Sequence, residues 1–211
     1  SKSMKSKILE NKRIKKERLI DAAYSLFSHN DLKNVSIQDI VTKAGVAKGT
    51  FYLYFKDKYM LRDHLVWREV SRLFKEAEAA LSENDIRNFE DSVIFIINHV
   101  LMALENNPVV LTFIRNNLSA GVFHEQLHTA LENEESFSLN EAFLALVKKY
   151  HYEFKDPTII LYLIIEMVGS CCYTSITENQ PLPIRELKPF LFDSIRAILH
   201  QGVPKEQPGN E

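Results

Sequence analysis

The sequence predicts an all-α protein, and three observations lead to that prediction. Apolar residues recur at the three-to-four-residue spacing of a helix along most of the chain. Only 6 of the 211 residues are Gly and 7 are Pro, so the turn signals that a β-sandwich or a Rossmann fold requires are too sparse. Apolar residues make up 45% and charged residues 26% of the chain, which is typical of a globular protein with a real core.

Charge is unevenly distributed along the chain. Residues 1–68 contain 15 Lys and Arg against 7 Asp and Glu, whereas residues 69–211 contain 11 against 21. A basic segment joined to an acidic remainder favours a polyanion-binding module followed by a part with another role. The two cysteines, Cys171 and Cys172, are adjacent and cannot join distant segments, and no apolar signal segment follows the basic N-terminus. Both features predict a protein of the reducing cytoplasm.

The first predicted helix begins in a basic stretch, residues 5–18, and continues into an amphipathic pattern. Its apolar positions share one face of a helix and end at Phe27. Asn30 and Asp31 are expected to end this helix, because both residue types tolerate the left-handed backbone of a helix end.

Three more helices are predicted up to residue 81. Ser36 and Asp39 have the spacing of a capping box, which indicates the start of the second helix. Gly45 is expected to supply a positive φ in the turn that follows. The third helix is short, residues 47–55. Asp57 is expected to cap a long fourth helix.

Five further helices are predicted in the remainder of the chain, about nine in all. The apolar run at residues 159–173 is shorter than a membrane span and contains Glu166, so a core or interface helix is expected there. The tail, residues 202–211, is polar, holds two Pro and is expected to be disordered. The ranges of the five helices are about 86–105, 108–121, 122–154 with a break near 132–138, 157–177 and 184–200.

Residues 36–55 have the pattern of a helix-turn-helix: two short helices joined by a glycine turn, with a basic segment ahead of them. The second helix of such a motif enters the major groove of DNA. Gly49 has no side chain, so the backbone there could approach DNA closely. Phe51 and Phe55 would anchor the opposite side of the helix. Donors and stacking groups on the DNA-facing side come from Lys48, Thr50, Tyr52 and Tyr54.

The segment SIQDIVTKAGVAKGTFYLYFKDKYML, which begins at Ser36, resembles the N-terminal domain of the tetracycline-repressor (TetR/AcrR) family of bacterial transcription regulators. Its most specific part runs from Ala44 to Phe55 and is followed by Lys58. The resemblance implies a helix-turn-helix DNA-binding domain at residues 1–58 and a ligand-binding and dimerisation domain at residues 59–201. It also implies a homodimer that binds a palindromic operator in double-stranded DNA.

The resemblance further implies roles for single residues. Positions matching Lys48, Thr50 and Tyr52 meet bases and phosphates in the family, and the position of Gln38 sometimes reads a base, since an amide can pair with adenine. Tyr54 and Lys58 match phosphate contacts in the family, and Ser36 matches the phosphate-facing start of the second helix. Domain packing is the alternative role for Tyr52 and Tyr54, and a solvated helix end is the alternative for Lys58. The DNA-binding candidates are Ser36, Gln38, Lys48, Gly49, Thr50, Tyr52, Tyr54 and Lys58.

The chain departs from the family pattern at two positions. Asp31 stands where the family usually has Gly, so the expected left-handed backbone would carry some cost. Ala47 stands where the family often has a Ser helix cap, which removes a cap worth about 1 kcal/mol and a potential phosphate contact.

A competing function comes from His124-Glu125-Gln126-Leu127-His128, which matches the HExxH pattern of zinc proteases. The two His fall on one helical face, and Glu132 could follow on the same face. A zinc hydrolase also needs a third ligand from elsewhere and an extended edge to hold a peptide, and the sequence indicates neither. A solvated helix face is the simpler interpretation, so neither a metal nor a cofactor is expected.

The sequence therefore predicts a DNA-binding regulator, a repressor by the family's habit, that a small molecule releases from its operator. A DNA-binding protein without a ligand is a further alternative. Aromatic residues on the later helices are expected to line an apolar cavity for a mostly apolar effector with one polar or cationic end. Cys171 and Cys172 are expected to be packing residues rather than redox sensors. The candidate effector residues are Phe95, His99, Met102, Phe113, Asn117, Phe143, Tyr162 and Glu166.

Overall fold

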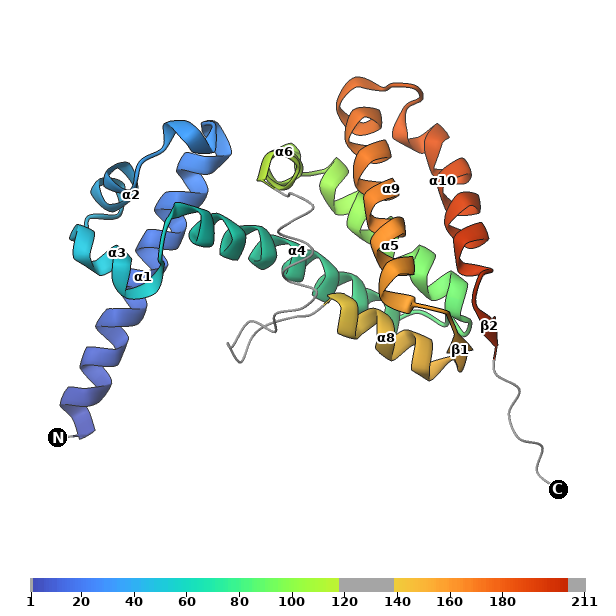
Figure 1. The fold of residues 1–211 in the computed structure, drawn as a ribbon, viewed down its shortest axis with the longest axis horizontal. Coiled ribbons are helices and arrows are strands. Elements are labelled where there is room, and N and C mark those ends of the chain that lie inside the picture. Colours follow the sequence, from blue (N-terminus) through green and yellow to red (C-terminus); the bar gives the residue numbers. More distant parts are fainter. Residues whose placement is uncertain (1, 118–138, 205–211) are drawn as a thin grey trace. The chain divides into compact units, whose positions relative to one another are not determined.

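The computed structural model describes residues 2–117 and 139–204, and within these ranges the regular secondary structure is helical apart from two strands of two residues each. The predicted all-α class is therefore confirmed (Figure 1). The elements are α1 (Lys2–His29), a 3₁₀ turn (Leu32–Asn34), α2 (Ile37–Ala44), α3 (Lys48–Tyr54), α4 (Lys58–Ser82), α5 (Phe89–Glu105), α6 (Pro108–Asn117), α8 (Leu139–Lys149), β1 (Tyr152–Glu153), α9 (Pro157–Glu178), α10 (Ile184–Leu199) and β2 (Val203–Pro204).

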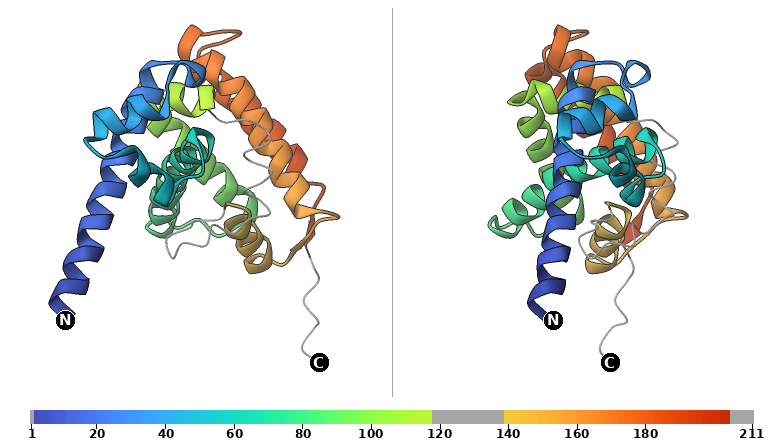
Figure 2. Two further views of the ribbon diagram at one scale, coloured as in Figure 1. Left: turned by 60° about the vertical axis from the view of Figure 1, so that its left-hand side comes forward. Right: turned by 90° about the vertical axis from the view of Figure 1, so that its left-hand side faces the viewer.

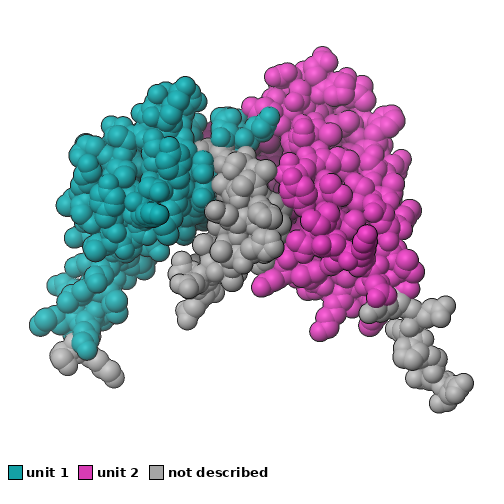
Figure 3. All heavy atoms as spheres, viewed as in Figure 1, with its two compact units in different colours: residues 1–70, 112–122 teal, residues 71–111, 123–211 magenta. Residues whose placement is uncertain are grey.

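The chain divides into two compact units (Figure 3). Unit 1 consists of residues 1–70 and 112–122, and unit 2 consists of residues 71–111 and 123–211. Helices α4 and α6 each contribute residues to both units, because the division falls within them.

The start of α2 is held by the capping box that the sequence predicts. The Ser36 hydroxyl accepts a hydrogen bond from the Asp39 N–H at 3.0 Å, and the Asp39 carboxylate accepts one from the Ser36 N–H at 2.8 Å. These bonds lower the pKa of the Asp39 carboxyl. Gly45 ends α2 with φ 68°, the left-handed conformation for which glycine is suited.

The third and fourth helices begin differently. Ala47 precedes α3, and its methyl side chain cannot accept a capping hydrogen bond, as predicted from the sequence. Asp57 precedes α4, and its carboxylate accepts a hydrogen bond from the Met60 N–H at 2.8 Å. The long helix α4 is therefore capped by a side chain, whereas the short helix α3 depends on packing for its position.

The end of α1 differs from the expectation at Asp31. This residue has φ −61° and ψ 138°, which is extended backbone, so the cost of a left-handed aspartate does not arise. The reason is local: a 3₁₀ turn at residues 32–34 continues directly from Asp31, whose carbonyl accepts a hydrogen bond from the Asn34 N–H at 2.9 Å. The substitution of the family's usual Gly by Asp31 is thus accommodated without strain.

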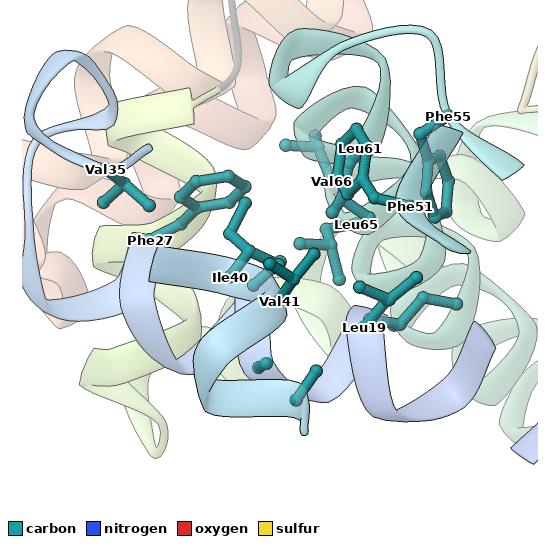
Figure 4. Packing of buried hydrophobic residues seen from close by; sticks show 14 of the residues in the cluster. Leu19, Phe27, Val35, Ile40, Val41, Phe51, Phe55, Leu61, Leu65 and Val66 are labelled. Carbon is teal, nitrogen blue, oxygen red and sulfur yellow. The ribbon is translucent and has the colours of Figure 1, made fainter. Parts of the chain in front are cut away.

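A single apolar cluster forms the core of unit 1 (Figure 4). It joins side chains from α1, α2, α3 and α4, and it includes Phe113 of α6, whose ring centroid lies 5.0 Å from that of Tyr24. Helix α3 is thereby fixed against the long helices α1 and α4. The largest fully buried side chains of this cluster are Leu19, Ile20, Ile40, Val41, Phe51, Leu61, Leu65 and Phe113.

In unit 2, α9 and α10 run antiparallel and pack side by side (Figure 2). Helix α10 is also tied to both ends of α5. Lys188 Nζ lies 2.9 Å from Glu105 near the end of α5, and Arg196 Nη2 lies 2.7 Å from Asp91 near its start. Among the described helices, α9 is long and apolar enough to cross a membrane by length and composition, a property that core helices of soluble proteins share.

The region after α8 corrects the predicted end, at residue 154, of the helix expected over residues 122–154, whereas the predicted break near residues 132–138 lies outside the described residues. The helix ends at Lys149, and His151 follows with φ 56°. Residues 152–153 then form β1, which pairs antiparallel with β2. The reason is aromatic packing: the Tyr152 ring lies 4.4 Å from that of Phe89, and Phe154 joins the same cluster. A continued helix could not direct both rings to Phe89.

The beginning of the predicted disordered tail also has a defined structure. Gly202 is buried beside Phe154, and Val203–Pro204 form β2. A Cβ atom at Gly202 would lie 2.5 Å from the Phe154 ring. The absence of a side chain at residue 202 therefore permits this close approach.

Candidate nucleic-acid interface

Helix α3 separates its residues into a buried and an exposed side. Phe51 and Phe55 are 0% and 3% exposed and lie in the core of unit 1, whereas Tyr52 is 53% exposed. Lys48 is also exposed, and Thr50 is half-buried. The predicted division of this helix into an anchoring side and an outward side is confirmed.

Gly49 lies on the exposed part of α3, and the chain itself does not require a glycine there. A Cβ atom at this position would meet no atom within 4 Å. Its backbone has no positive φ, unlike that of Gly45. Neither packing nor backbone strain therefore explains the glycine, and a close approach by an external molecule remains a physical reason for it.

Ser36 and Gln38 lie at the N-terminal end of α2 and are exposed. The Ser36 hydroxyl is engaged in the capping box, and the Gln38 amide donates to the Thr42 hydroxyl at 3.1 Å. This bond uses one of the two amide N–H donors of Gln38. The capping box orients the helix, and the glutamine keeps hydrogen-bonding capacity on the surface.

Tyr54, at the end of α3, lies against α1. Its hydroxyl donates to the main-chain carbonyl of Lys12 at 3.1 Å, and Lys16 Nζ lies 6.0 Å from the centroid of its ring. The structure thus brings two basic residues of α1 beside α3. The sequence shows that this stretch is basic, but only the packing shows which of its lysines reach α3.

Lys58 stands at the first position of α4 and is half-buried. Its ammonium donates to the carbonyls of Leu32 at 2.7 Å and Val35 at 2.9 Å. Two of its three N–H donors are therefore used to hold the segment that leads into Ser36. This position differs from the solvated helix end that the sequence allows.

His64, on α4, is a titratable group inside unit 1. Its ring centroid lies 5.8 Å from that of Phe55. Burial lowers the pKa of His64, and the positive charges of Lys16 and Arg68 lower it further. The neutral imidazole is therefore the form that suits the packed unit.

The candidate effector residues do not all lie in one part of the structure. Phe113 is the clearest correction, because it is 1% exposed in the core of unit 1 rather than in unit 2. Its position near the end of α6 places it in the part of that helix that belongs to unit 1. Since its ring is enclosed by core side chains, it packs the core of unit 1.

Asn117 also falls within unit 1, and the remaining candidates belong to unit 2. The rings of Phe95 and His99 on α5 stack at 6.1 Å, and Phe143 of α8 is buried 6.0 Å from Phe89. Met102 is 50% exposed. Tyr162 is half-buried on α9.

Helix α9 carries the remaining carboxylate candidate and both cysteines. Glu166 and Cys171 are exposed, whereas Cys172 is buried and its pKa is raised to about 12 by that burial. The Cys172 thiol is thus protonated and poorly reactive. The side chain of Asn117 and the segment His124–His128 with Glu132 lie outside the described residues, and the described ones contain no group of three metal-binding side chains.

Comparison with known sequences identifies the N-terminal part of the chain. Residues 19–65 match the family model described as bacterial regulatory proteins, tetR family. The uncharacterized HTH-type transcriptional regulator YdgC of Bacillus subtilis (strain 168) is 36% identical over 102 residues, which cover 48% of each chain. The chain spans about half the length of the first curated relatives it matches.

Comparison with solved structures extends the likeness of fold to nearly the whole chain. A TetR transcriptional regulator from Rhodococcus sp. RHA1 superimposes with a TM-score of 0.64 at 16% identity, over 90% of this chain and 97% of that one. FadR from Bacillus subtilis, solved in complex with stearoyl-CoA, superimposes with a TM-score of 0.55 at 15% identity, over 85% and 96%. The matched segment contains the capping box, the glycine turn and helix α3 described above, so residues 19–65 belong to the DNA-binding segment that defines the tetR family of bacterial regulatory proteins.

Proposed function

We propose that the chain is a transcription regulator that binds double-stranded DNA by placing α3 in the major groove. The observation that carries this proposal is the division of α3 into a buried side, with Phe51 and Phe55, and an exposed side, with Lys48 and Tyr52. The exposed side offers an ammonium and a phenol to bases and phosphates. Gly49, which has no side chain, lets the backbone of α3 approach the bases and phosphates. We propose that the regulator acts in the cytoplasm as a repressor.

The test is binding to DNA selected from a random pool of duplexes. Tyr52→Ala and Lys48→Ala are expected to weaken binding to the selected site by about 1–3 kcal/mol. Lys155→Ala removes one charge from an exposed position in unit 2 and serves as the control. A selection that returns no preferred sequence would favour a sequence-independent DNA-binding protein instead.

We propose that the regulator is a homodimer whose interface lies on α9 and α10. Ile159 and Leu163 of α9 are 51% and 45% exposed, and Phe190 of α10 is 66% exposed. These large apolar side chains lie on helices that already pack together on their other faces, so a second copy would cover them. A two-fold dimer reads a palindromic operator whose half-sites lie one helical turn, about 34–36 Å, or a multiple of it apart.

We propose that a mostly apolar small molecule with one polar end releases the regulator from DNA. Support comes from the aromatic residues of unit 2 and from the stearoyl-CoA complex of a protein with a similar fold. Phe113 is withdrawn from the effector residues because it packs the core of unit 1. The proposed set is Phe95, His99, Met102, Phe143, Tyr162 and Glu166, with Asn117 retained from the sequence.

Stearoyl-CoA, stearate and coenzyme A are the first probes for the effector. An acyl ligand is expected to raise the melting temperature by binding the folded state and to lower DNA affinity by its preference for the DNA-free state. Met102→Trp is expected to weaken that response, and Val109→Trp, also on an exposed apolar residue, is its control. Equal responses of both variants and the wild type would place the effector elsewhere.

A further inference from the structure

The first half of α1 is a basic helical arm, defined here as residues 2–18. It contains eight Lys and Arg and two Glu. Residues 3–15 are exposed throughout, so this part of the helix extends beyond the core of unit 1 (Figures 1 and 2). The first buried apolar residues of α1 are Leu19 and Ile20. The fold therefore does not account for most of the arm.

Charge is sorted around the arm. At 100° per residue, Lys5, Lys12 and Lys16 fall within one narrow face, whereas the two glutamates fall on another. Both glutamates have basic partners: Glu10 pairs with Arg13 at 2.6 Å, and Glu17 lies 3.7 Å from Arg68 of α4. The lysine face is therefore not neutralised by the acidic residues of its own helix.

The lysine face is continuous with the candidate interface. Tyr54 donates to the Lys12 carbonyl, and Lys16 Nζ lies over the Tyr54 ring. Tyr54 is the last residue of α3. A surface that begins at the recognition helix therefore passes through Tyr54 to Lys16 and Lys12 and continues along the arm to Lys5.

The length and charge of the arm fit a DNA strand. From Lys12 to Lys2 the helix extends about 15 Å, a distance over which one strand of B-DNA presents about four phosphates. The apolar residues of the arm do not form the continuous face that a membrane-surface helix needs. Met4 and Ile8 share one side, whereas Leu9 and Ile14 point in other directions.

We propose that the Lys5, Lys12 and Lys16 face of α1 binds the phosphate backbone of DNA beside the half-site that α3 reads. This inference rests on the proposed DNA-binding function and adds a second contact region to it. Phosphate contacts of this kind carry no sequence information but increase affinity and its dependence on salt. The arm thus lengthens the footprint of each subunit without changing the bases that are recognised.

The test compares two variants with the same change in charge. Lys5→Gln with Lys12→Gln alters the proposed face, and Lys7→Gln with Arg18→Gln alters the opposite side of the same helix. Lys16 is left unchanged because of its contact with Tyr54. The probes are the duplex that the wild type selects and the unselected random pool of equal length, each at 50 to 200 mM KCl.

The expected result is a loss of salt dependence confined to the first variant. Loss of two phosphate contacts lowers the slope of log affinity against log salt by about 1.8. Between 50 and 200 mM salt the wild type would then lose about 12-fold more affinity than this variant. The control should keep the wild-type slope, and both should keep its melting temperature, since the substituted side chains are exposed.

Three outcomes would overturn the proposal. Equally lowered salt slopes in the two variants would show that the arm contributes only its total charge and that DNA does not prefer one face of it. A wild-type slope in the first variant would show that the arm does not touch DNA. Loss of binding to vesicles of phosphatidylserine and phosphatidylcholine, with DNA binding unchanged, would assign the face to membranes. Failure of the selection to enrich any duplex would remove the proposed function, while the random pool still tests the arm.

Discussion

The rings of Tyr24 and Phe113 pack with their centroids 5.0 Å apart, which joins α1 to α6 inside unit 1. Phe113 comes from a helix that starts in unit 2 and ends in unit 1. The core of unit 1 therefore includes a residue far along the chain from the helix-turn-helix. A change in the position of α6 would act directly on the helix that supports α2 and α3.

Phe113→Ala is expected to lower the free energy of unfolding by about 3–5 kcal/mol, because it leaves a cavity in a closed core. Phe113→Trp should overpack the same site and cost about 1–3 kcal/mol. Both variants should bind DNA less tightly in the absence of any effector. Urea unfolding and gel shifts measure these effects, with Met102→Ala at an exposed position as the control. A Phe113→Trp variant with normal DNA affinity would contradict this role.

Lys58→Met is expected to lower stability and DNA affinity together while leaving the salt dependence of binding unchanged. The ammonium holds the carbonyls of Leu32 and Val35, and hydrogen bonds from a charged group contribute about 1.5–3 kcal/mol. Loosening this segment would misplace Ser36 at the start of α2.

A direct phosphate contact by Lys58 predicts a different pattern. The slope of log affinity against log salt would then fall by about 0.9, with little loss of stability. Lys56→Met, an exposed neighbour, controls for loss of the charge. Measuring the melting temperature and the slope on the same protein separates a positioning residue from a DNA contact.

The stability of unit 1 is expected to fall as the pH falls below about 6.5, the ordinary pKa of histidine. Burial lowers the pKa of His64 in the folded chain, so the unfolded chain takes up a proton first as the solution is acidified. Stability from the neutral ring is thus complete above the unfolded pKa and lost progressively down to the folded one. His64→Gln should flatten the dependence of the free energy of unfolding between pH 7.5 and pH 5. The same slope in His64→Gln and wild type would assign the pH dependence to other groups.

Leu163→Lys is expected to convert the proposed dimer into a monomer, because it places a charge within an apolar interface. Glu83→Lys adds positive charge at an exposed position after α4 and should leave assembly unchanged. Sedimentation equilibrium at micromolar concentrations distinguishes the two. If wild-type protein sediments as a monomer, the interface on α9 and α10 is wrong.

The features that the sequence predicts well are those that depend on neighbours in the chain. Three such features involve residues only a few positions apart, so the residue types alone identify them. They are the capping box of Ser36 and Asp39, the turn at Gly45 and the cap at Asp57. The burial of Phe51 and the exposure of Tyr52 follow from helical spacing alone. Helical spacing is therefore sufficient to assign the buried and outward sides of α3.

The features that the sequence does not predict depend on distant partners. Lys58 binds carbonyls at residues 32 and 35, and Phe113 joins a core made from the first 70 residues. Helical spacing predicts that the apolar side chain of Phe113 faces inward, but it cannot show in which of the two units that side chain is buried. The strand at residues 152–153 is missed because its aromatic packing on Phe89 outweighs the helical pattern that precedes it.

The contact between Gly202 and Phe154 limits how related sequences can vary. Any other residue at position 202 would bring a Cβ atom within 2.5 Å of the ring, so a larger residue there requires a smaller one at position 154. These two positions are expected to change together among homologues that keep the β1–β2 pair. Homologues with a bulky residue at both positions should lack this strand pair, and their backbone after α10 should follow another path.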